Sequence, residues 1–359
     1  MRNDRVKVSL RICAILLLIA LLFTACSATP TALPDPTGIR IHTEKQADYL
    51  AGKYGAIASY AKGTEELSRP LPATVILSDN PDEFVRIEYS EDPTFHDALT
   101  CAVTGGKAEI YNLKTDVPYY YRGIKADGER GTIGAIRVEN VLPRNLYIDG
   151  VTNARDLGGY ETENGKIRQG MLYRTAKLNK NKTDTPTPLI TEAGIDTMLN
   201  VLKVKTEVDL RKIENNEIGS LTASVLGPTV NYVNCPMSYD ADMPVANDES
   251  IRKLFSLLAK EESYPLFFHC SIGTDRTGYT AFLMLTILGA KPQDIYRDYL
   301  FSNFGNIGGN RTVLNVMGFT FFLATQDGSG FTEQAENYLL NLGVTMDEIE
   351  SFRRIMIEE

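Results

Sequence analysis

A cysteine and an arginine separated by five residues mark one segment of this chain, His269-Cys270-Ser271-Ile272-Gly273-Thr274-Asp275-Arg276-Thr277-Gly278. Five intervening residues can form a loop whose backbone N–H groups converge on one anion, and the positive end of a following helix adds to that attraction. A tetrahedral phosphate dianion fits such a loop. We therefore expect a phosphate-binding loop that consists of Ser271, Ile272, Gly273, Thr274, Asp275 and Arg276.

The residue types in this loop indicate a nucleophilic displacement at phosphorus. Anion-binding donors also favour a thiolate, so Cys270 should have a lowered pKa and act as the nucleophile. The planar guanidinium of Arg276 can bind two phosphate oxygens at once. Thr277 is placed to donate its hydroxyl to the sulfur when the sulfur leaves, and Gly273 allows a positive φ. His269 should point away from the pocket, as a structural, neutral histidine that braces the loop.

The elements around the loop predict an α/β domain. Pro265–His269 is a short apolar run typical of a central buried strand, and Arg276–Leu288 is a long apolar stretch stopped by Gly289, as expected of a core helix. Further strands are predicted at Thr206–Leu210 and Thr229–Val233. Two amphipathic helices are predicted at Glu249–Lys260 and, after the capping box Thr345-Met-Asp-Glu348, up to Met356.

This arrangement of strand, loop, Arg-Thr-Gly and helix resembles the protein tyrosine phosphatase superfamily. The resemblance is to bacterial tyrosine and dual-specificity phosphatases with an N-x-R-D-L-G-G opening and an H-C-x-x-G-K-D-R-T-G loop, and it covers roughly residues 145–359. It rests on Asn153-Ala-Arg155-Asp156-Leu-Gly-Gly159, on Leu172-Tyr-Arg174, and on Val208-Asp209-Leu-Arg211 before Glu214. We expect the upstream polar side chains to form a buried network that braces the loop: Asn153, Arg155, Asp156, Arg174, Asp209 and Arg211.

The resemblance implies a central sheet flanked by helices and an enzyme that hydrolyses phosphate monoesters through a phosphocysteine intermediate. The expected substrate is phosphotyrosine, while phosphoserine, phosphothreonine, phosphoinositides and inositol phosphates stay open. Thr274 replaces the lysine of the family loop, which weakens the expectation of polyanionic phosphoinositide substrates. A catalytically idle binding or adhesion lipoprotein is the alternative, and the intact Cys270 and Arg276 argue against it.

The general acid that protonates the leaving group has two candidate positions. In the similar bacterial enzymes the loop aspartate has this role, which carries over to Asp275. Most other members of the superfamily use an aspartate on a separate mobile loop, and Asp240 or Asp242 suits that position. We favour Asp275 and keep the other two as the alternative.

The N-terminus predicts export. Four cations, the last of them Arg11, precede an uncharged run over Ile12–Phe23, which suits a signal peptide and is too short to span a bilayer. The run ends in Leu22-Phe23-Thr24-Ala25-Cys26, which resembles a bacterial lipobox. We expect residues 1–25 to be removed and Cys26 to be lipidated, giving a membrane lipoprotein outside the cytoplasm, with simple secretion as the alternative. Residues 26–70 should then form a tether and a leader helix.

Residues 71–141 change to short β-branched and aromatic runs separated by turns, which predicts a small β-sandwich. Strands are expected at Thr74–Leu77, Phe84–Tyr89, Glu109–Leu113, Tyr119–Ile124 and Ile133–Val138. Leu113, six residues before Tyr119, resembles the tyrosine corner of a fibronectin type III domain. The catalytic domain should then occupy residues 142–359.

The composition of the chain limits the kinds of partner and cofactor that we expect it to bind. The net charge is -9, and removal of residues 1–25 would leave 33 cations against 45 anions, or -12, so a nucleic-acid partner is not expected. Three histidines without ligand spacing argue against a metal, and no cofactor is expected. Besides Cys26 the processed chain keeps Cys101, Cys235 and Cys270, which is poor material for a disulfide framework. A redox role of Cys235 and the oligomeric state stay open.

Overall fold

The described part of the chain begins within the predicted tether. This computed structural model describes residues 33–358, except 53–56, 58–60, 62–63, 65–67, 182–186, 214–216, 219–220 and 240–242. By internal contacts the chain divides into Met1–Asp35 and Pro36–Glu359, and the described helices and strands all lie in the second part. None of the described helices is long and apolar enough to cross a membrane. The signal peptide and Cys26 lie outside the described residues.

A five-stranded sheet forms the centre of the catalytic region. Its order is β13-β12-β14-β11-β8, with bounds Asn231–Asn234, Thr206–Asp209, Leu266–His269, Leu172–Thr175 and Arg155–Asp156. The central strand β14 is parallel to both neighbours, and all four of its residues are buried, as both faces of such a strand are covered. The register places Thr175 and Asp209 beside His269, so the loop after His269 leaves the sheet between the ends of two other strands.

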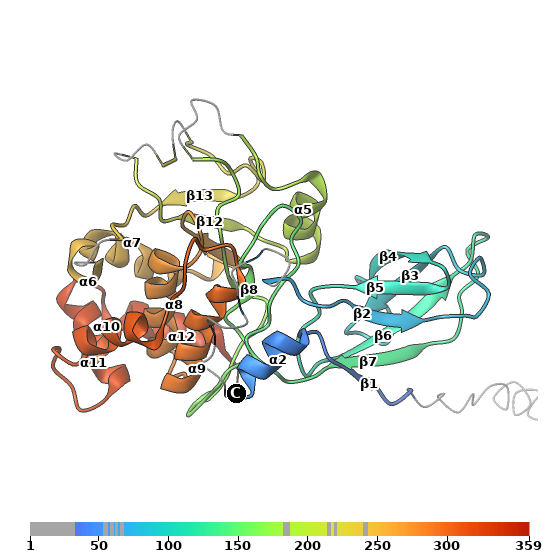
Figure 1. Cartoon of the computed structure of the whole chain (residues 1–359), viewed down its shortest axis with the longest axis horizontal. Coiled ribbons are helices and arrows are strands. Elements are labelled where there is room, and N and C mark those ends of the chain that lie inside the picture. Colours follow the sequence, from blue (N-terminus) through green and yellow to red (C-terminus); the bar gives the residue numbers. More distant parts are fainter. Residues whose placement is uncertain are drawn as a thin grey trace, which may run out of the picture. The chain divides into compact units, whose positions relative to one another are not determined.

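Helices pack around this sheet (Figure 1), and the helix that follows the loop is buried along almost its whole length. They are α5 (Glu192–Asp196), α6 (Met243–Ala246), α7 (Asp248–Leu258), α8 (Asp275–Ile287), α9 (Pro292–Phe301), α10 (Val313–Leu323), α11 (Phe331–Asn341) and α12 (Met346–Met356). Every residue of α8 after Asp275 is buried, which confirms the predicted core helix. Thr345 caps α12 through the predicted capping box. A small sheet, in the order β15-β10-β9, joins Ile357–Glu358, Gly165–Ile167 and Glu161–Thr162.

An all-β region precedes the catalytic region. Its seven-stranded sheet has the order β1-β7-β6-β3-β4-β5-β2. The bounds in chain order are Thr37–Ile39, Ala73–Ile76, Arg86–Ser90, Leu99–Thr104, Lys107–Ile110, Pro118–Ile124 and Gly134–Val138. Five of these strands overlap the predicted ones, whereas β1 and β4 were not expected. Strand β1 lies within the predicted tether and pairs in parallel with β7, so that part of the segment is folded.

The predicted corner is present in this region. Leu113 and Tyr119 are both buried in its apolar cluster. The Tyr119 hydroxyl accepts a hydrogen bond from the backbone N–H of Lys114 at 3.2 Å, and it donates to Glu91 at 2.9 Å. A buried tyrosine that bonds back to the backbone a few residues upstream is the feature by which such a corner is recognised.

The leader helix α2 (Glu44–Leu50) packs against the catalytic region. Its N-terminus is capped by Thr43 through a capping box. The Tyr49 hydroxyl donates to the backbone carbonyl of Arg297 at 2.8 Å, and its ring contacts those of Phe301 and Phe304. Residues predicted as part of a leader are therefore a component of the catalytic core.

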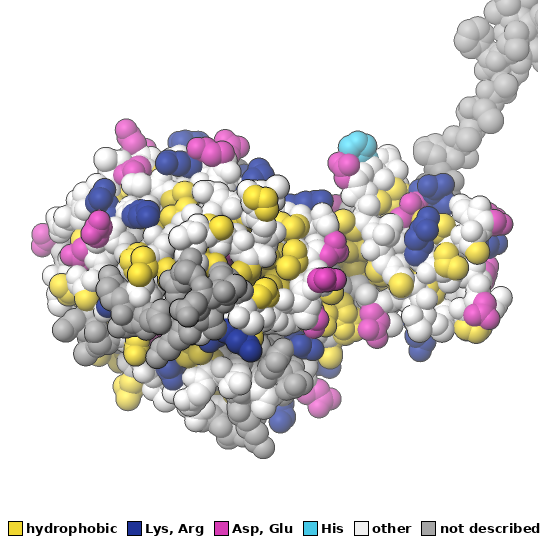
Figure 2. Space-filling view, turned by 90° about the horizontal axis from the view of Figure 1, so that it is seen from above, with side chains coloured by type: hydrophobic (Ala, Val, Ile, Leu, Met, Phe, Trp, Pro, Cys, Tyr) yellow, Lys and Arg dark blue, Asp and Glu magenta, His cyan; other side chains and the backbone are white. Residues whose placement is uncertain are grey.

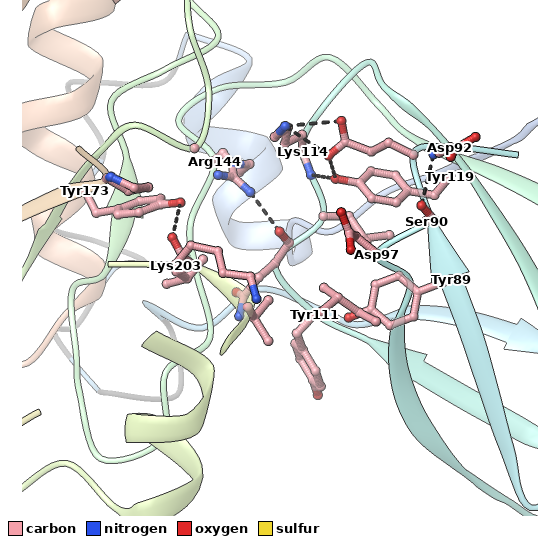
Figure 3. Close-up of a pocket in the computed structure, with 18 of the residues that line it drawn as sticks. Tyr89, Ser90, Asp92, Asp97, Tyr111, Lys114, Tyr119, Arg144, Tyr173 and Lys203 are labelled. Atoms are coloured by element: carbon pink, nitrogen blue, oxygen red, sulfur yellow. Dashed lines mark hydrogen bonds and ion pairs between the residues drawn. The ribbon is translucent and has the colours of Figure 1, made fainter. Parts of the chain in front are cut away.

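A cavity of about 490 Å³ is lined by residues of both regions (Figure 3). Beside it, Arg144 donates to the backbone carbonyl of Asn112 at 2.8 Å, and the side chain of Gln169 exchanges hydrogen bonds with Thr115. Neither Cys270 nor Arg276 lines this cavity, so it is separate from the predicted chemistry.

Candidate active site

The predicted loop forms a tight turn between β14 and α8. Gly273 has a φ of 69°, a conformation that favours glycine. A Cβ atom added at this position would lie 2.6 Å from the backbone oxygen of Thr175 and 2.8 Å from the backbone nitrogen of Ala176. The loop can therefore approach the neighbouring strand end only because this position carries no side chain.

Side chains from β11 and from the segment just before β8 hold the loop from behind. Asn153 donates to the carbonyl oxygens of Ile272 and Gly273 at 3.1 and 2.9 Å, and Arg174 donates to that of Gly273 at 2.8 Å. Arg155 in turn donates to the side-chain oxygen of Asn153 at 2.6 Å. Among the described residues, no carbonyl accepts a hydrogen bond from the backbone N–H groups of residues 271–274. The N–H groups of Ser271, Gly273 and Thr274 are therefore available to an anion, while that of Ile272 faces the sulfur of Cys270.

The predicted network is buried, but its six members fall into three groups with different partners. Asp298 of α9, which the sequence did not single out, joins Arg155 and Arg174. Asp156 instead pairs with Arg144, and the pair Asp209 and Arg211 lies at the end of β12. The six predicted residues and Asp298 all have exposed fractions of 3% or less.

The guanidinium of Arg276 is aligned by a carboxylate. Arg276 donates to Glu217 from both terminal nitrogens, at 2.6 and 2.8 Å. Burial alone would raise the pKa of Glu217, but the bonds from Arg276, Lys212 and Ser271 lower it to about 2. Burial would lower the pKa of Arg276, while Glu217 and Cys270 raise it above its ordinary value. The pair therefore fixes the plane of a permanently charged guanidinium beside the loop.

Cys270 lies at the base of the pocket, with 2% of its surface exposed. Burial would raise the pKa of its thiol, but Arg276, both donors of Thr277 and the backbone N–H of Ile272 lower it below the ordinary value. The Thr277 hydroxyl is buried and makes no conventional hydrogen bond in the described structure, so it is free to donate to the sulfur. These donors favour the thiolate form of Cys270 and oppose the effect of burial.

His269 points away from the pocket, as the sequence predicted. Its Nδ1 lies 3.2 Å from the carbonyl oxygen of Cys270, and its Nε2 lies 2.9 Å from Glu207. Neutrality stays a prediction: burial lowers the pKa of His269, but Asp209 and Glu207 raise it above the ordinary value. The neighbouring strand β12 supplies both carboxylates, and their negative charge opposes the effect of burial on the pKa of the imidazole.

Glu207, Asp209 and His269 also form a cluster of side chains of the types that can bind a metal ion. The ligand atoms of Glu207, Asp209 and His269 lie within 4.8 Å of one another. Arg211 donates to both oxygens of Asp209, and the hydroxyl of Tyr232 donates to one of them. Because a guanidinium already occupies the cation position at Asp209, the cluster does not fit a metal ion well.

The active-site pocket has a volume of about 580 Å³. It is lined by Asn181, Glu217, Tyr239, Cys270, Ser271, Ile272, Asp275 and Arg276. Asn181 donates to the hydroxyl of Ser271 at 3.0 Å, and the exposed ring of Tyr239 lies 5.2 Å from the guanidinium carbon of Arg276. The structure therefore brings Cys270, Asp275 and Arg276 together around one cavity that is open to solvent.

The structure describes one of the two candidate positions of the general acid, Asp275, but not the other. Asp275 lines the pocket, and its carboxylate is bound by Arg311 through two hydrogen bonds of 2.7 and 2.9 Å. Asp240 and Asp242 lie outside the described residues, directly after Tyr239.

Comparison with known proteins places this chain in a family. A model described as "Tyrosine phosphatase family" matches residues 146–358, more than half of the chain. The chain belongs to the tyrosine phosphatase family. A Cupriavidus necator protein, named as a provisional tyrosine-protein phosphatase, is 30% identical over 199 residues, which cover 48% of this chain and 68% of that protein.

Two solved structures of phosphatases show a weaker likeness. P. aeruginosa TpbA in complex with pTyr has a TM-score of 0.31 and 17% identity, over 51% of this chain and 91% of TpbA. The core catalytic domain of the PP-IP phosphatase SIW14 from S. cerevisiae, in complex with citrate, has a TM-score of 0.30 and 16% identity, over 45% and 86%. These scores are too low to carry an argument about this chain.

Several residues of this tyrosine phosphatase site were missed by the sequence interpretation. They are Asn181, Glu207, Glu217, Tyr239, Asp298 and Arg311. The resemblance directed attention to Glu214, which lies outside the described residues, whereas the carboxylate that pairs with Arg276 is Glu217. A requirement that every buried arginine have a carboxylate partner could have suggested Asp298, but not which aspartate it is.

Proposed function

We propose that the chain is an exported, cysteine-dependent phosphatase that hydrolyses phosphate monoesters through a phosphocysteine intermediate. The observation that carries the proposal is the lowered pKa of Cys270, at the base of a pocket that Arg276 and free loop N–H groups also line. Family membership supports phosphatase activity.

The first step would form a sulfur–phosphorus bond. The thiolate of Cys270 attacks phosphorus in line with the ester oxygen, while Arg276 and the loop N–H groups bind the three other oxygens. The phosphorus–oxygen ester bond breaks, and the leaving oxygen takes a proton from Asp275. The alcohol or phenol then departs with both bonding electrons and that proton.

The second step would release phosphate. Water attacks the phosphorus and gives a proton to the carboxylate of Asp275, while the sulfur–phosphorus bond breaks and its electrons return to Cys270. The Thr277 hydroxyl donates to the departing thiolate. No metal ion takes part in either step. The same scheme holds with Asp240 or Asp242 as the acid.

The proposed substrate is phosphotyrosine, with phosphoserine, phosphothreonine, phosphoinositides and inositol phosphates as further candidates. The family supports a phosphorylated substrate. Thr274, in place of the family lysine, leaves the loop without a second cation for a polyanion. On the face shown in Figure 2, the described cationic and anionic side chains are interspersed, with neither sign gathered into one large area. A singly phosphorylated group therefore fits best.

The proposal also covers the cellular location of the protein and the role of its all-β region. We infer that residues 1–25 are removed, that Cys26 carries lipid, and that the all-β region is a fibronectin type III-like spacer. The lipobox-like sequence and the tyrosine corner support these points. Labelling of expressing cells with a lipid precursor should mark the wild type but not Cys26→Ser. Equal labelling of both would contradict lipidation at this residue.

The decisive experiment is hydrolysis of p-nitrophenyl phosphate by the full-length chain in mild detergent, with reductant and chelator. We expect turnover that Cys270→Ser and vanadate both abolish. Cys235→Ser is the matched control, because Cys235 is also buried and burial raises its pKa to about 11. That variant should keep its activity. A folded wild type without turnover would instead favour the idle binding or adhesion protein.

A further inference from the structure

The arginine bound to Asp275 is held in place by a buried amide. Arg311 lies in the segment between α9 and α10, and its backbone N–H donates to the side-chain oxygen of Asn303 at 2.7 Å. The side-chain nitrogen of Asn303 donates back to the carbonyl oxygen of Arg311 at 3.0 Å, and to that of Leu300 at 2.8 Å. Because Asn303 is 1% exposed, this attachment belongs to the core rather than to a free surface loop.

The side chain of Arg311 meets Asp275 fork to fork. Its Nε donates to Oδ1 at 2.7 Å and its Nη2 to Oδ2 at 2.9 Å. The two side chains are 19% and 27% exposed, so the pair is partly shielded from water. Planar pairs of this kind restrict the orientation of the carboxylate as well as its position. The bond to Asp275 is also the largest cause of the raised pKa of Arg311.

Asp275 stands between Arg311 and the pocket. Asp275 is one of the lining residues and Arg311 is not, so Arg311 reaches the reacting atoms through that carboxylate. The other titratable group recorded beside the pair is Tyr299 of α9, whose pKa is raised, by burial first and then by Asp275. The hydroxyl of Tyr299 therefore stays neutral and adds no charge.

An unpaired carboxylate at this position would oppose the proposed reaction. It would repel an entering phosphate dianion, and it could rotate away from the leaving oxygen. A fixed guanidinium removes both difficulties, because it compensates the charge and holds the carboxyl at the side of the loop. When Asp275 carries the proton that it later gives, one of its two oxygens gives up its bond to Arg311 and can face the substrate.

We propose that Arg311 is a positioning residue of this site, which acts through Asp275 on protonation of the leaving group. The inference rests on the proposed phosphatase function and selects Asp275 rather than Asp240 or Asp242 as the group that exchanges the proton. A residue that supports only the fold would slow every substrate alike. A residue that acts through the acid slows chiefly substrates whose leaving group needs a proton.

The experiment therefore compares two substrates. Phenyl phosphate has a basic leaving group that needs a proton, while p-nitrophenolate leaves readily without one. In full-length chain in mild detergent, Arg311→Gln should lower kcat/KM for phenyl phosphate about 30-fold but for p-nitrophenyl phosphate only about threefold. Arg311→Lys, which keeps the charge and loses the fork, should give a smaller loss with the same preference.

A double-mutant cycle tests the route through Asp275. In the Asp275→Asn background, Arg311→Gln should change kcat/KM for phenyl phosphate by less than about twofold, because the acid is already absent. Arg353→Gln is the matched control. Arg353 also pairs with a carboxylate, Glu336, and is 27% exposed, but it lies away from the pocket. It should leave the ratio of the two substrates unchanged.

The outcomes separate this inference from the proposed function. Equal losses for both substrates, or the same loss with and without Asp275, would overturn the role of Arg311, while turnover that depends on Cys270 would still support the phosphatase. A folded wild type without turnover would overturn both. If Arg311→Gln does not fold, as thermal unfolding would reveal, Arg311→Lys is measured in the same cycle and decides by the same criteria.

Discussion

Two carboxylates in the described part of this chain, Asp298 and Glu88, each bind two arginines. The two groups differ in how far their side chains are buried. In the catalytic region, Asp298 accepts from Arg155 at 2.7 Å and from Arg174 at 2.5 Å, and all three side chains are at most 1% exposed. In the all-β region, Glu88 accepts from Arg122 and, at 3.0 Å, from Arg130, which is 56% exposed. The same arrangement of charges therefore exists once in the core and once near water.

The difference shows what each region depends on. Removal of one partner from a buried group leaves a charge that water cannot reach, whereas an exposed charge is simply hydrated. The all-β region is built around an apolar cluster that includes Ile87, Ile136 and Val138, so its charges are peripheral. The catalytic region keeps charges inside because they hold the loop between β14 and α8. Activity there is tied to stability.

The largest effect is expected from Asp298→Asn. Arg155 and Arg174 would stay buried without a full counter-charge, so the free energy of unfolding should fall by about 3–5 kcal/mol. Urea denaturation of the full-length chain in mild detergent would measure it. Asp294→Asn, on the same helix but 20% exposed and paired with Arg297, is the control and should cost less than about 1 kcal/mol. Similar losses in both variants would contradict the importance of burial.

The next effect concerns catalysis at the loop. Arg276→Lys keeps the charge but cannot bind two phosphate oxygens and Glu217 in one plane, so kcat/KM should fall at least about 100-fold. Steady-state kinetics with p-nitrophenyl phosphate would measure the loss. Arg353→Lys, away from the pocket, should leave the rate unchanged. Equal rates in wild type and Arg276→Lys would show that only the charge matters.

A smaller effect depends on pH. The pKa of Glu217 is about 2, below its ordinary value of 4.5, because Arg276 outweighs burial. Its pairing therefore stabilises the fold fully above pH 4.5, and this contribution is lost as the pH falls from 4.5 toward 2. After allowance for solvent at the open pocket, about 1–2 kcal/mol should disappear over that range. Glu217→Gln should flatten this part of the curve of unfolding free energy against pH. An unchanged slope would contradict the pairing.

The smallest effect is expected from Glu88→Gln in the all-β region. Arg122 and Arg130 would keep access to water, so the free energy of unfolding should fall by less than about 1 kcal/mol. Phosphatase activity should not change, since Glu88 lies outside the catalytic region. A loss of unfolding free energy as large as that of Asp298→Asn would mean that exposure does not decide how much these ion pairs stabilise the fold.

Local patterns allowed much of the catalytic region to be predicted. The strand, loop and core helix around Cys270 are continuous in sequence, so apolar runs and one glycine were enough to place them. Family membership and phosphatase activity also followed from the loop and its upstream motifs. In the all-β region the short strand β1 has too few residues to show alternation, and β4 is only half-buried along its length.

The partners of the loop could not be predicted because they are distant in sequence. Glu217 lies 59 positions before Arg276, and Arg311 lies 36 positions after Asp275. The raised pKa of His269 depends on which strand pairs with β14, and the register of β12 brings Asp209 beside it. Periodicity and spacing describe one element at a time, whereas these contacts arise from the order of strands in a sheet.

Helix α2 packs against residues that are synthesised much later, so it cannot reach its final position early in synthesis. Tyr49 bonds to Arg297, 248 positions later, and its ring contacts Phe301 and Phe304. At the other end, β15 pairs with β10, nearly 200 positions before it. The catalytic core therefore cannot close while the chain is emerging, and its N-terminal helix must wait for almost the whole polypeptide. The catalytic region of the nascent chain therefore stays unfolded until its last helices are made, and an unfolded chain can still pass through a narrow channel.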